Sequence, residues 1–203
     1  MPASGSTWPP DAERRLAGRR ERMSEFEYVS VGIALVYSFT VARLVASLPA
    51  VLAPVRRYWV HGLWTLVLLL ATVSTWWTIW QLREVEWNPL RFMWALTVPA
   101  LIYLRAGILL SDAPAAVESW RAHFYERRVP FFGVGVLIAC NFGAMPLLMG
   151  FSPWSLMSSA YVPLALMLGI SIGGLVSSKP AVHGTLVLGN LLMVLVSMAA
   201  ASI

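Results

Sequence analysis

The chain has 203 residues, of which 58% are hydrophobic and 12% are charged, and its mean hydropathy is +0.68. A soluble domain is about 25% charged, so this composition excludes an ordinary water-soluble globule and indicates a membrane protein. The net charge of +5 comes from short basic clusters between apolar runs. That pattern is typical of topology control and of contact with anionic lipid headgroups, and not of nucleic-acid binding.

Residues 1–24 form a basic tail that is rich in Pro, Ala, Gly and Arg and has no hydrophobic period. This composition predicts disorder. The apolar segment that follows is too long for the core of a signal peptide. An alternative interpretation places the initiator at Met23, since the chain from there reads as a short polar lead and then a span. Residues 25–203 are predicted to form one transmembrane domain.

Six long apolar segments follow in chain order. Runs of about 20 apolar residues cross a hydrocarbon core of about 30 Å as helices, because lipid offers the backbone no external hydrogen-bond partner. The sequence therefore predicts an all-α fold, a polytopic transmembrane helical bundle. Its spans are predicted over 26–48, 58–81, 88–110, 131–149, 153–176 and 180–201.

The longest linker predicts a further helix over 113–128, capped by Ser111 or Asp112. At 100° per residue, an apolar stripe is flanked by basic residues. The stripe holds Ala113, Val117, Trp120 and Phe124, and the flanking residues are Arg121, Arg127 and Arg128. This pattern indicates an interfacial amphipathic helix that lies on the membrane, its arginines reaching for anionic headgroups. The alternative is a helix that gates the bundle or docks a partner.

Orientation depends on the basic residues of the short loops, because cytoplasmic loops carry an excess of Lys and Arg. With the N-terminus outside and translation from Met23, six basic residues lie inside and two, Arg83 and Arg91, lie outside. Translocating the full basic tail would remove this preference. The sequence thus favours a multi-pass protein of the bacterial inner membrane with both termini outside.

Two arginines, Arg43 and Arg105, fall inside predicted spans that run in parallel. Each lies near the same membrane face, a turn or two from its edge. Snorkelling towards lipid phosphates accounts for both. The alternative is a site for an anion or a lipid headgroup formed by this pair, with the basic residues of the interfacial helix as further headgroup contacts.

Polar side chains recur on one face of the second span and on one face of the sixth. They are His61, Thr65 and Thr72 in the second span and His183, Asn190 and Ser197 in the sixth. Polar stripes within lipid face the bundle interior or a cavity. One interpretation is hydrogen bonding between helices. The other is a polar path through the bundle with the two histidines near its cytoplasmic mouth.

The sequence contains few residues that could act as catalytic groups or cofactor ligands. There is no Gly-x-Ser-x-Gly elbow, and no Asp lies inside a span. The single cysteine, Cys140, excludes a Cys-based metal site within one chain. No Cys-x-x-Cys-His or His-Glu-x-x-His motif accompanies the three histidines to support haem or metal binding. Four carboxylates, Glu25, Glu27, Glu84 and Glu86, cluster at the face opposite the two intramembrane arginines and the histidines His61 and His183, out of reach for acid–base partnership. No catalytic residue, metal ligand or cofactor is predicted.

The pair Gly169-x-x-x-Gly173 allows close helix approach and predicts a face for homo-oligomer formation. The stretches Phe26-Glu27-Tyr28-Val29-Ser30-Val31, Arg56-Arg57-Tyr58-Trp59 and Trp76-Trp77 resemble those of small hypothetical bacterial inner-membrane proteins. That resemblance implies a bacterial origin and brings no activity with it.

Three functions therefore stand as hypotheses. The first is a small transporter or channel-like protein in which the polar stripes line the path. The second is a structural or regulatory membrane subunit that binds anionic lipid or a partner. The third is a lipid-active enzyme that holds the headgroup with the two intramembrane arginines, although no nucleophile or base is evident beside them.

Overall fold

The computed structural model describes residues 24–54, 57–150 and 161–200. The predicted basic tail and the first part of the predicted fifth span lie outside the described residues. The elements are α2 (Glu25–Leu52), α3 (Trp59–Thr78), η1 (Ile79–Leu82), α4 (Pro89–Leu109), η2 (Pro114–Ala116), α5 (Trp120–Met149), α6 (Tyr161–Val176) and α7 (Pro180–Ala200). The predicted all-α helical bundle is confirmed.

Local chemistry explains where several helices begin and end. Ser24 caps α2 because its hydroxyl accepts from the Glu27 N–H at 3.2 Å, while the Glu27 carboxylate accepts from the Ser24 N–H at 2.8 Å. The Asn88 side chain caps α4 in the same sense, at 2.9 Å from the Arg91 N–H. Helix α5 ends at Gly150, whose φ of 78° is the left-handed conformation that glycine adopts without strain.

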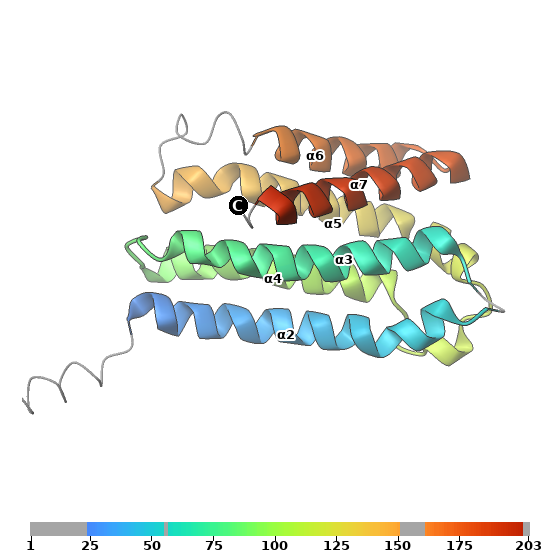
Figure 1. Cartoon of the computed structure of the whole chain (residues 1–203), viewed down its shortest axis with the longest axis horizontal. Coiled ribbons are helices and arrows are strands. Elements are labelled where there is room, and N and C mark those ends of the chain that lie inside the picture. Colours follow the sequence, from blue (N-terminus) through green and yellow to red (C-terminus); the bar gives the residue numbers. More distant parts are fainter. Residues whose placement is uncertain (1–23, 55–56, 151–160, 201–203) are drawn as a thin grey trace, which may run out of the picture.

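The helices alternate in direction and form a closed ring. Each packs against its neighbour in the order α2, α4, α5, α6, α7, α3 and back to α2, and α3 also touches α4 across the ring. Figure 1 shows α2, α4 and α6 beginning at one end of the bundle, where α3 and α5 finish. We call this end the acidic end, because Glu25, Glu27, Glu84 and Glu86 lie there. The opposite end, where α3, α5 and α7 begin, is the basic end.

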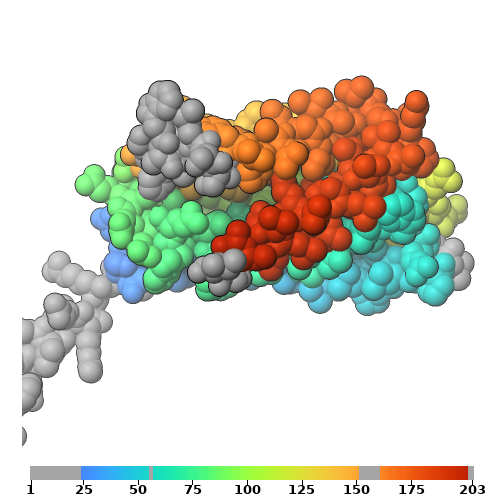
Figure 2. Space-filling view, turned by 45° about the horizontal axis from the view of Figure 1, so that its top comes forward, coloured from blue at the N-terminus to red at the C-terminus, as the bar shows by residue number. Residues whose placement is uncertain are grey.

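The outer surface is apolar, as a surface facing lipid must be. Figure 2 shows one face, formed largely by α6 and α7. Leu188, Leu192 and Val196 of α7 are each more than half exposed. Exposed tryptophans lie towards both ends, with Trp59 at the basic end and Trp76 and Trp77 near the acidic end, which is the arrangement of interfacial aromatic belts.

Five helices are long and apolar enough to cross a membrane, namely α2, α3 with η1, α4 with the segment up to Ala116, α5 and α7. The described part of α6 has 16 residues and covers about 24 Å. The chain is an integral membrane protein.

The predicted separate interfacial helix over 113–128 is wrong. The chain forms the short 3-10 turn η2, and α5 then runs without a break from Trp120 to Met149, capped by Ser119 instead of Ser111 or Asp112. Trp120 and Phe124, which were expected to enter lipid, are 0% and 2% exposed. Their rings pack on His61 of α3 and His183 of α7. The apolar stripe is therefore covered by other helices of the bundle, whereas the prediction had it covered by lipid.

Candidate functional site

A cavity of about 40 Å³ lies between α2, α3 with η1, α4 and α5, in the half of the bundle towards the acidic end. It reaches that end, since Leu82 and Met149, the last residues of η1 and α5, are part of its lining. One ordered water needs about 10–15 Å³, so the cavity has room for about three. Most of the lining is apolar, and the polar lining residues are Tyr37, Thr75, Thr78, Trp94 and Asn141.

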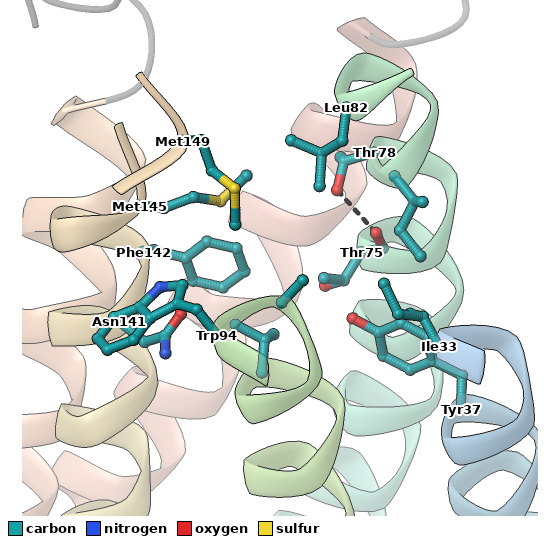
Figure 3. A pocket seen from close by; sticks show the side chains of 13 residues that line it. Ile33, Tyr37, Thr75, Thr78, Leu82, Trp94, Asn141, Phe142, Met145 and Met149 are labelled. Atoms are coloured by element: carbon teal, nitrogen blue, oxygen red, sulfur yellow. Dashed lines mark hydrogen bonds between the residues drawn. The ribbon is translucent and has the colours of Figure 1, made fainter. Parts of the chain in front are cut away.

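Two polar atoms of this lining have no hydrogen-bond partner among the described residues. They are the carbonyl oxygen of the Asn141 side chain and the indole N–H of Trp94, and both are buried. Figure 3 shows Tyr37 reaching in from α2 with its hydroxyl towards the middle of the cavity. Buried polar atoms without a partner also occur away from the cavity, at Trp64 and Trp87 for example, but beside the cavity there is room for the bound water or ligand that such atoms call for. The cavity is therefore the candidate binding site.

Hydrogen bonds hold the Asn141 amide in one orientation. The Thr97 hydroxyl donates to the Trp94 carbonyl at 2.6 Å, which uses its only hydrogen. It can therefore only accept from Asn141, whose amide nitrogen donates to it. The amide oxygen is left as a free acceptor.

The three histidines gather at the basic end among aromatic rings. His61 stacks on Trp120 with ring centroids 4.6 Å apart, and His183 stacks on Phe132 at 5.5 Å. His123 lies edge-on to His61 at 6.2 Å. The sequence placed His61 and His183 at one face of the membrane, and the structure brings both to one end of the bundle. In the described part of the chain, no three His, Cys, Asp or Glu side chains are placed to hold a metal ion.

Several polar side chains at the basic end contact backbone carbonyl oxygens at helix ends. His123 lies 3.2 Å from the Leu109 carbonyl at the end of α4, and His183 lies 2.8 Å from that of Ser177, just after α6. The Trp120 indole donates to the Ala50 carbonyl at 2.9 Å, an oxygen that has no helical donor because Pro54 lacks an N–H. These groups satisfy the backbone where helices stop.

The remaining polar-path candidates differ in burial. Thr65 and Thr72 are 0% exposed, and each donates to a carbonyl of its own helix, at 3.0 and 2.6 Å. Asn190 is 5% exposed, whereas Ser197 is exposed. Both stripes lie on helices that pack against each other, α3 and α7. Ser197 does not belong to the buried polar set.

Arg105 is 5% exposed although it is charged. Its guanidinium lies 4.4 Å from the centre of the Phe131 ring and 5.6 Å from that of Trp64. Two of its nitrogens, Nε and Nη2, have no hydrogen-bond partner within the described ranges. Gly135 makes the close fit possible, because a Cβ there would lie 3.0 Å from Nη2 and 2.7 Å from the Ser171 hydroxyl.

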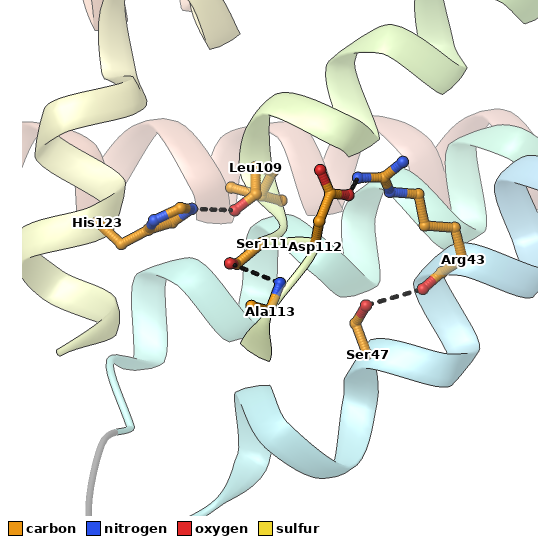
Figure 4. Close-up of polar contacts among 7 residues, drawn as sticks. All are labelled: Arg43, Ser47, Leu109, Ser111, Asp112, Ala113 and His123. Atoms are coloured by element: carbon orange, nitrogen blue, oxygen red, sulfur yellow. Dashed lines mark hydrogen bonds and ion pairs between the residues drawn. The ribbon is translucent and has the colours of Figure 1, made fainter. Parts of the chain in front are cut away.

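Arg43 has a different neighbourhood. It forms an ion pair with Asp112, in the segment after α4, and lies over the Tyr103 ring at 5.8 Å. Figure 4 shows this pair beside the His123 contact with the Leu109 carbonyl. Arg43 packs at Gly107, two residues and about 200° around α4 from Arg105. The structure thus places the two arginines on opposite sides of α4, in place of the paired arrangement considered from the sequence.

The other predicted headgroup contacts divide into two kinds. Arg121 and Arg127 are exposed at the basic end. Arg128 is half-buried and donates to the Ser177 carbonyl.

Tyr58 lies at the basic end, just before α3. Burial and a 3.3 Å hydrogen bond with Tyr125 raise the pKa of its phenol above the ordinary value.

The glycine pair of α6 is only partly free for a partner chain. A Cβ at Gly173 would lie 3.4 Å from Leu186 of α7, inside the same bundle, whereas nothing lies within 4 Å at Gly169.

Sequence reasoning missed the cavity and its two unpartnered groups. The available signal was a lone Asn in the middle of an apolar span, since polar residues at that depth are rare. Nothing in the sequence indicated that Trp94 would share a cavity with it, because the cavity is formed by four helices together. No protein-family model, no curated protein and no solved structure matches this chain.

Proposed function

We propose that this protein is a small transporter or channel-like protein that passes a small solute between its helices. The observation that carries the proposal is the cavity between α2, α3, α4 and α5, two of whose lining residues carry buried polar atoms without a partner among the described residues. Hydrocarbon offers such atoms no hydrogen-bond partner, so water or a solute inside the cavity is needed to pair them. A passing solute supplies the partner.

An apolar barrier closes the path below the cavity. It consists of Ile102, Val134 and Ile138, which are 4–7% exposed and belong to one packed cluster. Ile138 lies one turn before Asn141, and Ile102 one turn before Arg105. The barrier therefore lies between the cavity and the level of Arg105, and we infer that this arrangement is a state closed towards the basic end.

The proposal includes an orientation and a membrane. Arg57, Arg121, Arg127 and Lys179 are exposed at the basic end, and basic loops stay in the cytoplasm. We infer that the cavity opens to the outside of a bacterial inner membrane, with both ends of the described chain on that side. His61 and His183 then line the cytoplasmic end of the path.

Cysteine accessibility tests this function in a Cys140→Ala background. Single cysteines at Thr75 and Asn141 sit in the cavity, and one at Ile138 sits in the barrier. Silver ion is a membrane-impermeant thiol reagent small enough for this cavity, and from the outside it is expected to label the first two cysteines and to spare the third. Protection of both cavity positions from either side would refute the solute path.

A second function is favoured by the exposed arginines of the basic end, Arg121 and Arg127. We propose as the alternative a membrane subunit that binds anionic headgroups there, with Gly169 free for contact with a second copy. Gln substitution at both arginines would then release co-purified anionic lipid, measured by mass spectrometry of the protein–lipid complex. Unchanged lipid retention would exclude this alternative.

A further inference from the structure

Beside the Tyr37 hydroxyl, which can donate or accept, two lining residues of the cavity carry one buried donor and one buried acceptor that are without a partner among the described residues. The Trp94 indole N–H can only donate, and the Asn141 side-chain oxygen can only accept. Because Thr97 holds the Asn141 nitrogen, the amide cannot turn to present a donor without losing that bond. A ligand that satisfies both atoms must therefore carry an acceptor for Trp94 and a donor for Asn141.

Charge and size narrow the ligand further. None of the thirteen lining residues is charged, and an ion without a counter-charge is costly to bury. The cavity of about 40 Å³ takes about three or four heavy atoms by comparison with water. Apolar side chains such as Phe142 and Met145 make up much of the rest of the lining, so a small methyl group would be accepted as well.

We propose that the cavity binds a small uncharged solute of the amide or urea class. Its carbonyl oxygen accepts from the Trp94 indole N–H, and its N–H donates to the Asn141 oxygen. The proposal rests on the proposed function and names the class of solute that this function would serve. Arg105 agrees with it, because an unpaired positive charge beyond the barrier repels cations.

Three probes of almost one shape test the charge requirement. Acetamide is neutral, acetate is an anion and acetamidinium is a cation, and all have four heavy atoms. Saturation-transfer NMR on the full-length protein in detergent would measure the dissociation constant of each. We expect acetamide and urea to bind at least about tenfold more tightly than either ion. Equal binding of the ions, or binding of none of the probes, which would leave a cavity for water alone, overturns the proposal.

Paired tryptophan variants test the location. Trp94→Phe keeps a ring and removes the donor, and it is expected to weaken acetamide binding about three- to tenfold, the value of one net hydrogen bond. Trp87→Phe is the matched control, because the Trp87 indole N–H is also buried and unpartnered but lies outside the cavity. Equal effects of the two variants would overturn the assignment.

Thr97 provides a test of the amide orientation. Thr97→Val removes the acceptor that fixes Asn141 and is expected to weaken acetamide binding, whereas Thr97→Ser keeps the hydroxyl and restores it. If both variants bind as the parent protein does, the donor–acceptor assignment is wrong.

The two levels of the proposal fail separately. Labelling of cysteines at Thr75 and Asn141 without acetamide binding would leave the solute path standing and reject the amide class. Absence of both labelling and binding would reject the path as well.

Discussion

The guanidinium of Arg105 lies 4.4 Å from the centre of the Phe131 ring, and no ion pair to it is present within the described residues. A cation over an aromatic face gains about 0.5–2 kcal/mol. This offsets only part of the cost of burying a charge among membrane-spanning helices. The residue therefore costs folding free energy, which indicates a role other than stability.

Arg105→Met tests that role with two measurements. Replacing a buried charge with an apolar side chain of similar length is neutral or stabilising, so the thermal unfolding temperature is expected to stay equal or rise. Cation leak into proteoliposomes is expected to increase, since the repelling charge is gone. Arg43→Met is the control, because Arg43 is less buried and paired. A large loss of stability in Arg105→Met would show that the guanidinium is structural after all.

Gly174 provides a test of packing at the α5–α6 contact. A Cβ there would lie 2.4 Å from the ring of Phe132, a side chain that is 0% exposed and has no room to move away. Gly174→Ala is expected to destabilise the bundle by about 1–3 kcal/mol through overpacking. Thermal unfolding in nanodiscs would measure this loss.

Gly189→Ala on α7 is the matched control for that change, because nothing lies within 4 Å of its Cβ position. It is expected to be neutral or to stabilise the helix by up to about 1 kcal/mol. A loss in this variant comparable to that of Gly174→Ala would contradict the packing argument.

The fold was predictable because composition and run length decide it. Continuous apolar segments leave only helices in lipid. The described helices overlap the expected spans, although α5 begins at Trp120 and not at 131, and five of them are long enough to cross a membrane. The prediction of a separate interfacial helix was wrong because it also relied on composition and periodicity alone. An apolar stripe such as that of Trp120 and Phe124 shows that a partner is required, but the pattern is the same whether lipid or another helix provides it.

The site was only partly predictable. Reasoning from the direction of each span placed His61 and His183 at one end of the bundle, because both lie near the start of an even-numbered span. It failed for Arg43 and Arg105, because their side of α4 depends on how α2 and α5 are rotated. The cavity around Asn141 was not predicted for the same reason, since its lining comes from four helices whose relative placement the sequence does not give.

The ion pair of Arg43 and Asp112 joins α2 to the segment after α4 and is expected to contribute little. The Asp112 side chain is 90% exposed, and exposed pairs are worth about 0–1 kcal/mol. Asp112→Asn should therefore lower the free energy of unfolding by no more than about 1 kcal/mol, and the difference should shrink at high salt. Glu118→Gln, a change of an exposed carboxylate in the same segment, is the control. A salt-independent loss of several kcal/mol would mean that the pair is shielded from water.

Val134 tests whether the apolar barrier controls passage. Val134→Ala removes two methyl groups from the barrier and is expected to raise the permeability of proteoliposomes to acetamide, measured by osmotic reswelling in a stopped-flow instrument. Val194→Ala is the matched control, because Val194 is equally buried at 7% exposure but lies in α7, in a different apolar cluster. Both variants should lose about 1–3 kcal/mol of stability from the cavity left behind. Of the two variants, only Val134→Ala should alter permeability, since Val134 belongs to the barrier between the cavity and Arg105 and Val194 does not. Equal permeability of the two variants would place the barrier elsewhere in the bundle.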